Sequence, residues 1–174
     1  MNHLKKYYDN YVHRYLIEIL KGEMMMKAVI NESELHHQHK EVIVEALKKD
    51  MYANHLGIEL IEVGEGTAIA ELTAEAHMLN AHGTLHGAVT FAIADYVFAA
   101  ACNSYGRTAV ALSNTINYMA AGKEGALIRA TAEEVKKNYR TAWYTIKVES
   151  DGELIATMDA TAYRLGSYFV PLED

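Results

Sequence analysis

The sequence has few of the residues and segments that mark several classes of protein. Its single cysteine cannot form an internal disulfide, which excludes a disulfide scaffold and fits a reducing compartment. Its 16 basic residues are outnumbered by 23 acidic ones, and the net charge of −7 excludes the basic surface that nucleic-acid binding requires. No uncharged apolar run reaches the roughly 18 residues of a membrane span, and the N-terminus has no signal-peptide core. These absences predict a soluble cytoplasmic protein that binds neither nucleic acid nor membranes.

A single proline among 174 residues, with 51% hydrophobic residues, predicts a packed globule rather than a disordered chain. Residues 3–21 place apolar side chains at spacings of three and four and end before Gly22, which predicts an amphipathic helix. We expect its apolar face to pack on this chain or on a neighbouring subunit, and a membrane-surface or partner-binding helix is the alternative. Residues 1–25 are therefore interpreted as an N-terminal helical extension, and residues 26–174 as the main domain.

A second helix is expected over residues 32–52, where Asn31 and Glu34 have the spacing of an N-cap and its N3 partner. The segment contains three histidines, and imidazoles that lie close together can bind zinc or copper. However, only His36 and His39 share a helix face, and no cysteine or carboxylate completes a tetrahedral set. We therefore expect a solvated helix face here and no metal site.

Beyond Gly57 the hydrophobic pattern changes to a period of two residues. Two such runs flank Gly64-Glu65-Gly66, which predicts a hairpin. Residues 86–104 then form an apolar segment that predicts a helix buried on nearly every side. The remaining strand-like runs cover residues 108–119, 126–137, 141–150 and 153–165. This order predicts an α+β fold in which an antiparallel sheet wraps around one central helix.

The central apolar segment, AVTFAIADYVFAAAC over residues 88–102, contains one carboxylate, Asp95. Moving a carboxylate out of water costs several kcal/mol unless it is paired or hydrogen-bonded. Neither the four residues before Asp95 nor the four after it include a cation. A group outside this helix must therefore stabilise the charge. Cys102 lies seven residues further on, and among alanines it is typical of a core filler rather than a nucleophile.

The start of the same segment has the features of an oxyanion site. A helix that begins near His86 and Gly87 points free backbone N–H groups and the positive end of its dipole at whatever lies in front of it. Such groups stabilise a carbonyl that gains negative charge during acyl transfer. Asp95 is then a nucleophile or the base that activates water, Asn80 orients either group, and His86 polarises the carbonyl or holds the loop. Glycines and histidines at these positions are also typical of an ordinary turn and helix start.

The stretch NAHGTLHGAVTFAIAD, with ACNSYG and INYMAAG further along, resembles the signature N-x-x-G-x-x-H-G-G-x-x-x-x-x-x-D of hotdog-fold acyl-CoA thioesterases. It is most similar to the phenylacetic-acid-degradation (PaaI-like) subfamily. The resemblance covers about residues 45–166 and implies that residues 26–174 form a hotdog thioesterase domain. The helix at 3–21 has no counterpart in the pattern. Ala88 replaces the second adjacent glycine, and its methyl group is expected to narrow the pocket.

The resemblance also implies a role for each matching residue. Asp95 corresponds to the catalytic carboxylate, Gly87 to the oxyanion-hole amide and His86 to the adjoining carbonyl contact. Asn80 corresponds to the asparagine near the reacting centre, and Gly83 to the loop glycine. The family needs no cofactor beyond the coenzyme A of its substrate.

Two further sets of residues are candidates for contacting the substrate. Some members of the family place a serine or threonine on the next strand, and Ser113 and Thr115 are the candidates here. The basic string of the later hairpin is a candidate to contact the phosphates of coenzyme A, although such a string is also typical of a solvated turn. It consists of Lys136, Lys137 and Arg140.

The expected function is hydrolysis of an acyl-CoA thioester, with an aryl-acetyl group as one candidate acyl chain. A hotdog dehydratase or hydratase would use other histidine–carboxylate patterns, which the sequence lacks. A non-catalytic module that senses acyl-CoA is the alternative from a different class. Such a sensor needs no carboxylate beside the thioester, whereas this sequence has Asp95.

The spacing of the two reactive groups predicts an oligomer. Gly87 and Asp95 are eight residues apart on one expected helix, which separates them by about 12 Å along its axis. Reacting groups must lie about 3–3.5 Å apart, so one chain cannot apply both to the same carbonyl. We therefore expect a homodimer in which two antiparallel central helices form two shared sites. The family resemblance implies the same dimer, often paired into a tetramer.

Overall fold

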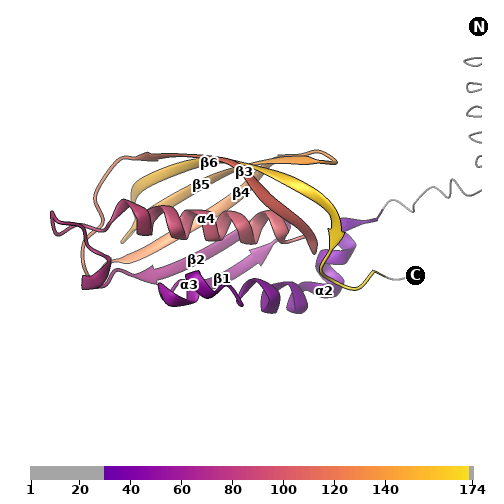
Figure 1. The fold of residues 1–174 in the computed structure, drawn as a ribbon, viewed down its shortest axis with the longest axis horizontal. Coiled ribbons are helices and arrows are strands. Elements are labelled where there is room, and N and C mark those ends of the chain that lie inside the picture. The colour runs from indigo at the N-terminus through magenta and orange to yellow at the C-terminus, as the bar shows by residue number, and fades with distance from the viewer. Residues whose placement is uncertain (1–29, 173–174) are drawn as a thin grey trace, which may run out of the picture. The chain divides into compact units, whose positions relative to one another are not determined.

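The computed structural model describes residues 30–172, so the helix expected at 3–21 and the boundary expected after residue 25 lie outside the described residues. The elements, in chain order, are α2 (Glu32–Leu47), α3 (Met51–His55), β1 (Glu59–Gly64), β2 (Thr67–Thr73), the 3-10 helix η1 (Ala76–Met78), α4 (Gly87–Asn103), β3 (Arg107–Tyr118), β4 (Leu127–Lys137), β5 (Thr141–Ser150) and β6 (Glu153–Tyr168). The six strands form one sheet that curves around α4 (Figure 1). The expected α+β hotdog architecture is confirmed.

The sheet has the strand order β1-β2-β4-β5-β6-β3, and every neighbouring pair is antiparallel. Tight turns join β4, β5 and β6 in succession. Between β5 and β6, Asp151 and Gly152 have φ values of 50° and 84°, the left-handed conformation that an Asp-Gly hairpin turn requires. Strands β1 and β3 form the two edges of this sheet.

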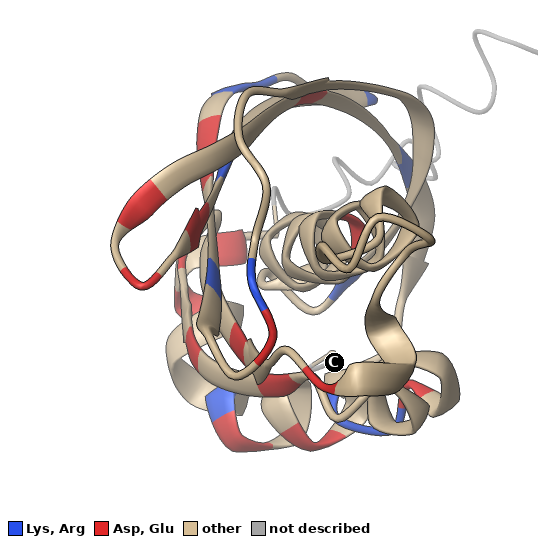
Figure 2. Cartoon of the chain, turned by 90° about the vertical axis from the view of Figure 1, so that its left-hand side faces the viewer, with Lys and Arg blue, Asp and Glu red and all other residues tan. Residues whose placement is uncertain are grey.

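The core lies between α4 and the concave face of the sheet, where many side chains are small. Alternate positions on β2, β4, β5 and β6 place buried alanines against the helix, and the short side chains allow a close approach. These alanines are Ala68, Ala70, Ala130, Ala132, Ala142, Ala156, Ala160 and Ala162. Phe98 of α4 packs edge-on against Tyr144 of β5, with ring centroids 5.4 Å apart. Figure 2, an end-on view, shows α4 enclosed by the curved sheet.

The single helix expected over residues 32–52 is wrong, because the structure has two helices there. α2 ends at Leu47, and Asp50 starts α3 as its N-cap. One oxygen of the Asp50 carboxylate accepts hydrogen bonds from the backbone N–H groups of Tyr52 at 3.0 Å and Ala53 at 2.9 Å. The cap redirects the chain, and α3 then lies beside α4 (Figure 1).

The expectation of a solvated histidine face on α2 is wrong for His36. Its side chain is buried, and its Nδ1 donates a hydrogen bond of 2.8 Å to the carbonyl oxygen of Ser104, just after α4. A buried imidazole needs such a partner in place of water, so His36 joins α2 to the end of the central helix. Within residues 30–172, no three histidine, cysteine or acidic side chains lie close enough together to hold a metal ion.

A buried ion-pair cluster fixes the start of α2. Glu32 accepts hydrogen bonds from Arg107 at 3.2 Å and from Arg164, and Lys137 Nζ lies 3.3 Å from the same carboxylate. Burial alone would raise the pKa of Glu32, but hydrogen bonds and charges from Arg164, Arg107 and Lys137 lower it below its ordinary value. The cluster connects α2 to β3, β6 and the β4–β5 hairpin.

No helix in the described part of the chain is long and apolar enough to cross a membrane.

Candidate active site

Asn80 and Gly83 shape the loop that leads into α4. The Asn80 Oδ1 accepts hydrogen bonds from the backbone N–H groups of His82 at 2.9 Å and Thr84 at 3.3 Å, and its Nδ2 donates to Thr84 Oγ1 at 2.9 Å. Gly83 has a φ of 72°, which favours glycine, and its N–H donates to the Asn80 carbonyl at 3.0 Å. Both polar ends of the Asn80 side chain are thus engaged inside the loop. Its expected role beside the reacting centre stays a prediction.

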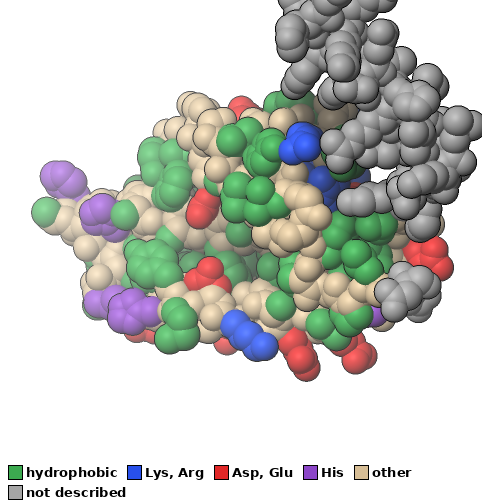
Figure 3. All heavy atoms as spheres, turned by 45° about the vertical axis from the view of Figure 1, so that its right-hand side comes forward, with side chains coloured by type: hydrophobic (Ala, Val, Ile, Leu, Met, Phe, Trp, Pro, Cys, Tyr) green, Lys and Arg blue, Asp and Glu red, His purple; other side chains and the backbone are tan. Residues whose placement is uncertain are grey.

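His86 caps the N-terminus of α4. Its Nδ1 accepts a hydrogen bond of 2.9 Å from the N–H of Ala88. This bond places the proton of the neutral ring on Nε2, which is then able to donate to a carbonyl. Figure 3 shows histidine side chains gathered at the end of the molecule where this loop lies.

Gly87 supplies the first backbone N–H of α4. Within residues 30–172 that N–H donates no hydrogen bond, so it remains available to an oxyanion at the positive end of the helix. On the other side of the residue, the Tyr118 hydroxyl donates to the Gly87 carbonyl oxygen at 3.0 Å. The loop and the cap therefore hold the free N–H in a fixed position.

Asp95 lies half-buried in the middle of α4, and its hydrogen-bond partner comes from another element. The Nδ2 of Asn114, on β3, donates to Asp95 Oδ1 at 2.6 Å. Burial raises the pKa of Asp95 above its ordinary value; the bond from Asn114 opposes that shift, and the negative charge of Asp50 adds to it. The structure thus supplies the stabilising group outside the helix that the sequence requires.

Sequence reasoning missed Asn114 because β3 contains a bulge. The pairing with β6 shifts between Ala111 and Ser113, so Leu112 is an extra residue on β3. Without it, Ser113 and Thr115 would share the face of buried Ala109. The extra residue reverses which side chains point toward α4 along the rest of β3. The side chain of Asn114 therefore faces Asp95, in place of Ser113 and Thr115. No feature of the local sequence marks this bulge.

Ser113 and Thr115, the two expected candidates, flank Asn114 on β3 and are exposed. Because neighbouring residues of a strand point to opposite faces, both side chains point away from the Asp95 of their own chain. Their contact with substrate stays a prediction.

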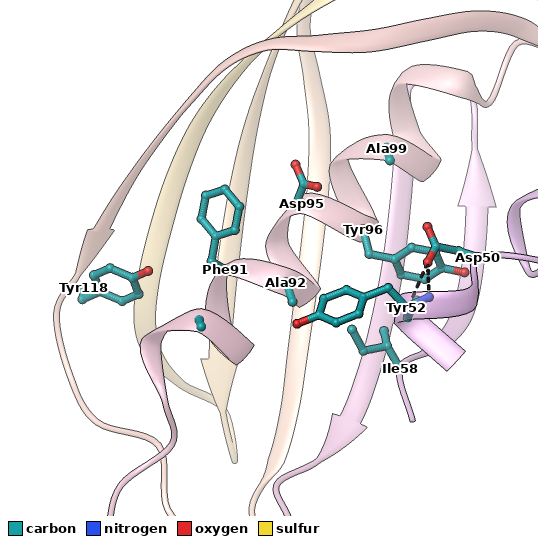
Figure 4. A pocket seen from close by; sticks show the side chains of 11 residues that line it. Asp50, Tyr52, Ile58, Phe91, Ala92, Asp95, Tyr96, Ala99 and Tyr118 are labelled. Atoms are coloured by element: carbon teal, nitrogen blue, oxygen red, sulfur yellow. Dashed lines mark hydrogen bonds between the residues drawn. The ribbon is translucent and has the colours of Figure 1, made fainter. Parts of the chain in front are cut away.

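A pocket of about 580 Å³ opens beside Asp95, between α4 and α3. Figure 4 shows Asp95 and Phe91 projecting on the same side of α4, while Asp50 and Tyr52 approach from α3. Most of the residues that line the pocket are aromatic residues and alanines. Among the described residues, the lining includes two carboxylates but no lysine or arginine. The lining residues are Asp50, Tyr52, Ala53, Ile58, Ala88, Phe91, Ala92, Asp95, Tyr96, Ala99 and Tyr118.

The pocket corrects the expectation that α4 is buried on nearly every side. Ala88, Phe91, Ala92, Asp95 and Ala99 recur at spacings of three and four, so they form one stripe along the helix. Phe91, Ala92, Asp95 and Ala99 are partly exposed and Ala88 is exposed, whereas the opposite side of α4 is buried against the sheet. One face of the central helix is therefore open in the single chain.

The candidate phosphate-binding cations lie outside this pocket. Lys137 is held by Glu32, and Arg140 donates a hydrogen bond of 2.7 Å to the Tyr163 hydroxyl, whereas Lys136 is exposed on β4. None of the three basic residues lines the pocket of its own chain. Their contact with coenzyme A stays a prediction.

Cys102 is a poor alternative nucleophile. It is buried, and burial, reinforced by the charge of Asp95, raises the pKa of its thiol to about 12. Very little thiolate would exist near neutral pH, and the thiolate is the nucleophilic form. The expectation that it fills the core is confirmed.

The similarity of this chain to known proteins covers the segment that contains the candidate site. The Thioesterase superfamily model matches residues 82–157. The chain is 37% identical to acyl-coenzyme A thioesterase PaaI of Escherichia coli (strain K12) over 120 residues, which are 68% of this chain and 86% of that protein. It is 32% identical to acyl-coenzyme A thioesterase 13 of Homo sapiens over 122 residues, which are 67% and 87% of the two chains.

Solved structures show the same similarity in three dimensions. The E. coli PaaI protein matches with a TM-score of 0.71 at 33% identity, over 78% of this chain and 97% of that chain. A point mutant of the phenylacetic acid degradation protein PaaI from Thermus thermophilus matches with a TM-score of 0.65 at 38% identity, over 67% and 100%. The chain therefore belongs to the thioesterase superfamily, in the PaaI-like subfamily of hotdog-fold enzymes.

Proposed function

We propose that this protein hydrolyses acyl-CoA thioesters to a free acid and coenzyme A, with Asp95 as the catalytic carboxylate. The observation that carries the proposal is the half-buried Asp95 side chain in a largely apolar pocket of about 580 Å³. A pocket of this size and lining suits an acyl chain. Of the two carboxylates that line it, Asp50 caps α3, which leaves Asp95 as the group placed to react there. The names of the E. coli and human relatives, both acyl-coenzyme A thioesterases, support the same substrate class.

The chemistry follows from the groups present. Asp95 either takes a proton from the attacking water or attacks the carbonyl carbon itself, and water then hydrolyses the resulting anhydride. Both routes put negative charge on the thioester oxygen, which the free Gly87 N–H and the His86 Nε2–H stabilise. The bond from carbon to sulfur breaks, the sulfur takes a proton, and coenzyme A leaves as a thiol.

Each site is shared by two subunits in this proposal. On α4, Gly87 and Asp95 are separated by about 12 Å, so the oxyanion donor for one Asp95 comes from a second chain. Two features support a homodimer: the open face of α4, and the exposed edge of β3, where Val110 and Leu112 are 47% and 58% exposed. An unpaired edge of this length is a ready site for pairing with another strand. Pairing of dimers into a tetramer is the further assembly we expect.

The lining of the pocket supports an uncharged acyl group. Phe91, Tyr52 and Tyr96 present aromatic rings, which suit aryl-acetyl as well as aliphatic chains. The name of the Thermus relative, a phenylacetic acid degradation protein, supports the aryl-acetyl group. A panel of short, medium, long and aryl acyl-CoAs, with thiol release measured for each, ranks these candidates.

Asp95→Asn separates the enzyme from a non-catalytic sensor of acyl-CoA. The substitution keeps the shape of the side chain and removes its charge, so we expect kcat to fall at least about a hundredfold while acyl-CoA still binds. Thiol release measures turnover, and calorimetry measures binding. If the variant keeps more than about a tenth of the wild-type kcat, a difference of about 1.4 kcal/mol in barrier, Asp95 is not the main catalyst.

A further inference from the structure

The side chain of Asn114 makes a single hydrogen bond within the described residues, and that bond goes to Asp95. Its Nδ2 donates to Asp95 Oδ1 at 2.6 Å. Its Oδ1 is buried and has no hydrogen-bond partner within residues 30–172. The amide therefore does not link β3 to any other described element.

An apolar side chain would suit the packing at this position better. Ile116, the next residue on the same face of β3, packs against the hydrophobic core. A buried amide that leaves its carbonyl oxygen unpaired lowers stability relative to a hydrocarbon of similar shape. The interaction that offsets this cost is the bond to the carboxylate.

We infer that Asn114 is a positioning residue for thioester hydrolysis, holding Asp95 Oδ1 so that Oδ2 is the oxygen left to meet water or the thioester carbon. This inference rests on the proposed catalytic role of Asp95. The carboxylate is free to rotate about its terminal bond unless one oxygen is held. The bond from β3 fixes that rotation, and the bulge at Leu112 is the feature that brings residue 114 to the carboxylate.

The same bond favours the ionised form of Asp95. Burial and the charge of Asp50 both favour the protonated acid, and the hydrogen bond from Asn114 is the one described interaction that favours the carboxylate. The other titratable groups among the described residues that line the pocket are three tyrosines, Tyr52, Tyr96 and Tyr118. Loss of the amide is therefore expected to raise the pKa of Asp95.

Asn114→Leu tests both effects, because leucine has nearly the same shape and no donor. We expect kcat at neutral pH to fall roughly ten- to a hundredfold with little change in KM, and the acid limb of kcat/KM to move to higher pH. The titration of Asp95, followed by ¹³C NMR of the labelled carboxyl group, should move in the same direction. Asn117→Leu, the same change at an exposed position of β3, should leave this titration where it is in the wild type.

Asn114→Asp provides a second, independent variant. When one proton is shared by the two carboxyl groups, the protonated side chain introduced on β3 donates to Asp95 and replaces the lost amide. Activity should then approach that of the wild type at mildly acidic pH and fall as the shared proton is lost. This new alkaline limb is an effect that damage to the fold alone would not produce.

The outcomes separate this inference from the proposed function. If Asp95→Asn stays active, the proposed catalytic role fails. If Asp95→Asn is inactive but Asn114→Leu has the wild-type kcat, acid limb and Asp95 titration, Asn114 does not position the carboxylate. If Asn114→Leu fails to fold, Asn114→Asp decides alone: an alkaline limb supports the inference, and its absence overturns it.

Discussion

Asp95 combines a reactive group with surroundings that oppose its charge. Burial in the pocket and the nearby Asp50 carboxylate both raise its pKa, and Asn114 compensates in part. A general base works best when its pKa approaches the working pH. The raised pKa of Asp95 therefore suits the proposed reaction better than the lower pKa of an exposed aspartate would. The same surroundings make the carboxylate sensitive to any change in charge beside it.

Asp50→Asn tests this sensitivity. In the proposed reaction Asp95 acts as a carboxylate, so activity should fall as the pH drops through its pKa. The raised pKa places that acid limb above the range of an ordinary aspartate. Removing the charge of Asp50 lowers the pKa of Asp95, and the acid limb of kcat/KM should move to lower pH. Asparagine is as good an N-cap as aspartate, so α3 should be retained.

The control for Asp50→Asn is Glu75→Gln, which removes an exposed carboxylate that does not line the pocket. Its acid limb should coincide with that of the wild type. An unchanged limb in Asp50→Asn itself would contradict the influence of Asp50 on Asp95.

At the scale of elements, regular patterns were predictable and local interruptions were not. The alternation of apolar and polar residues and the Asp151-Gly152 turn predicted the strands, and the apolar segment at residues 86–104 predicted α4. The break between α2 and α3 depends on Asp50 capping a new helix, which competes with the periodicity of a single longer one. The bulge at Leu112 depends on pairing with a distant strand, and for that reason Asn114 was missed.

Glu32, the first residue of α2, is expected to stabilise the fold strongly. Glu32→Gln keeps the size of the side chain but leaves Arg107 and Arg164, both nearly fully buried, without a negative partner. Breaking a buried ion pair in this way costs about 3–5 kcal/mol in the free energy of unfolding. Denaturant unfolding at pH 7 measures the loss, and Glu41→Gln, at an exposed position on the same helix, should change stability little.

The effect of Glu32 should also depend on pH, with a definite sign. Its pKa in the folded protein is lowered below 4.5, so its contribution is fully present above that pH and is lost as pH falls through the folded pKa. The stability difference between wild type and Glu32→Gln should therefore shrink in acid. A difference that stays constant as the pH falls through this range would show that the carboxylate is not held ionised by the cluster.

At the scale of the whole molecule, the sequence predicts that one chain cannot form a complete site, and this stays a prediction. The separation of Gly87 and Asp95 follows from helix geometry alone, and the structure adds an open helix face and an exposed β3 edge. The pocket could not be predicted, because its wall includes α3, whose start depends on the unpredicted cap at Asp50. The candidate reactive groups could therefore be predicted from one short stretch of sequence. The pocket around them could not, because its walls are formed by residues that lie far apart in the sequence.

Mixing two inactive variants tests the shared site. Gly87→Pro removes the donor N–H; proline is tolerated at the first helical position, and His86 already has the extended conformation that precedes proline (φ −67°, ψ 133°). Co-refolding it with Asp95→Asn gives mixed dimers with one intact and one doubly damaged site. Random pairing makes half the dimers mixed, so activity should return to about a quarter of wild type.

Gly87→Ala is the matched control, because it keeps the N–H and its added Cβ would lie 3.4 Å from the nearest Tyr118 ring atoms, an ordinary contact. It should remain active. If mass spectrometry detects mixed dimers, both variants are folded and the mixture is still inactive, the shared-site arrangement is wrong.

In the proposed shared-site dimer, the spacing along α4 also has a genetic consequence. In a cell with equal amounts of wild-type and Asp95→Asn subunits, every site that receives a wild-type Asp95 works, so about half the activity survives and the allele is recessive. An allele with both Asp95→Asn and Gly87→Pro damages both sites of every mixed dimer, which leaves about a quarter. Overexpressed, the doubly altered subunit would be a dominant inhibitor of the normal enzyme, while each single lesion would not.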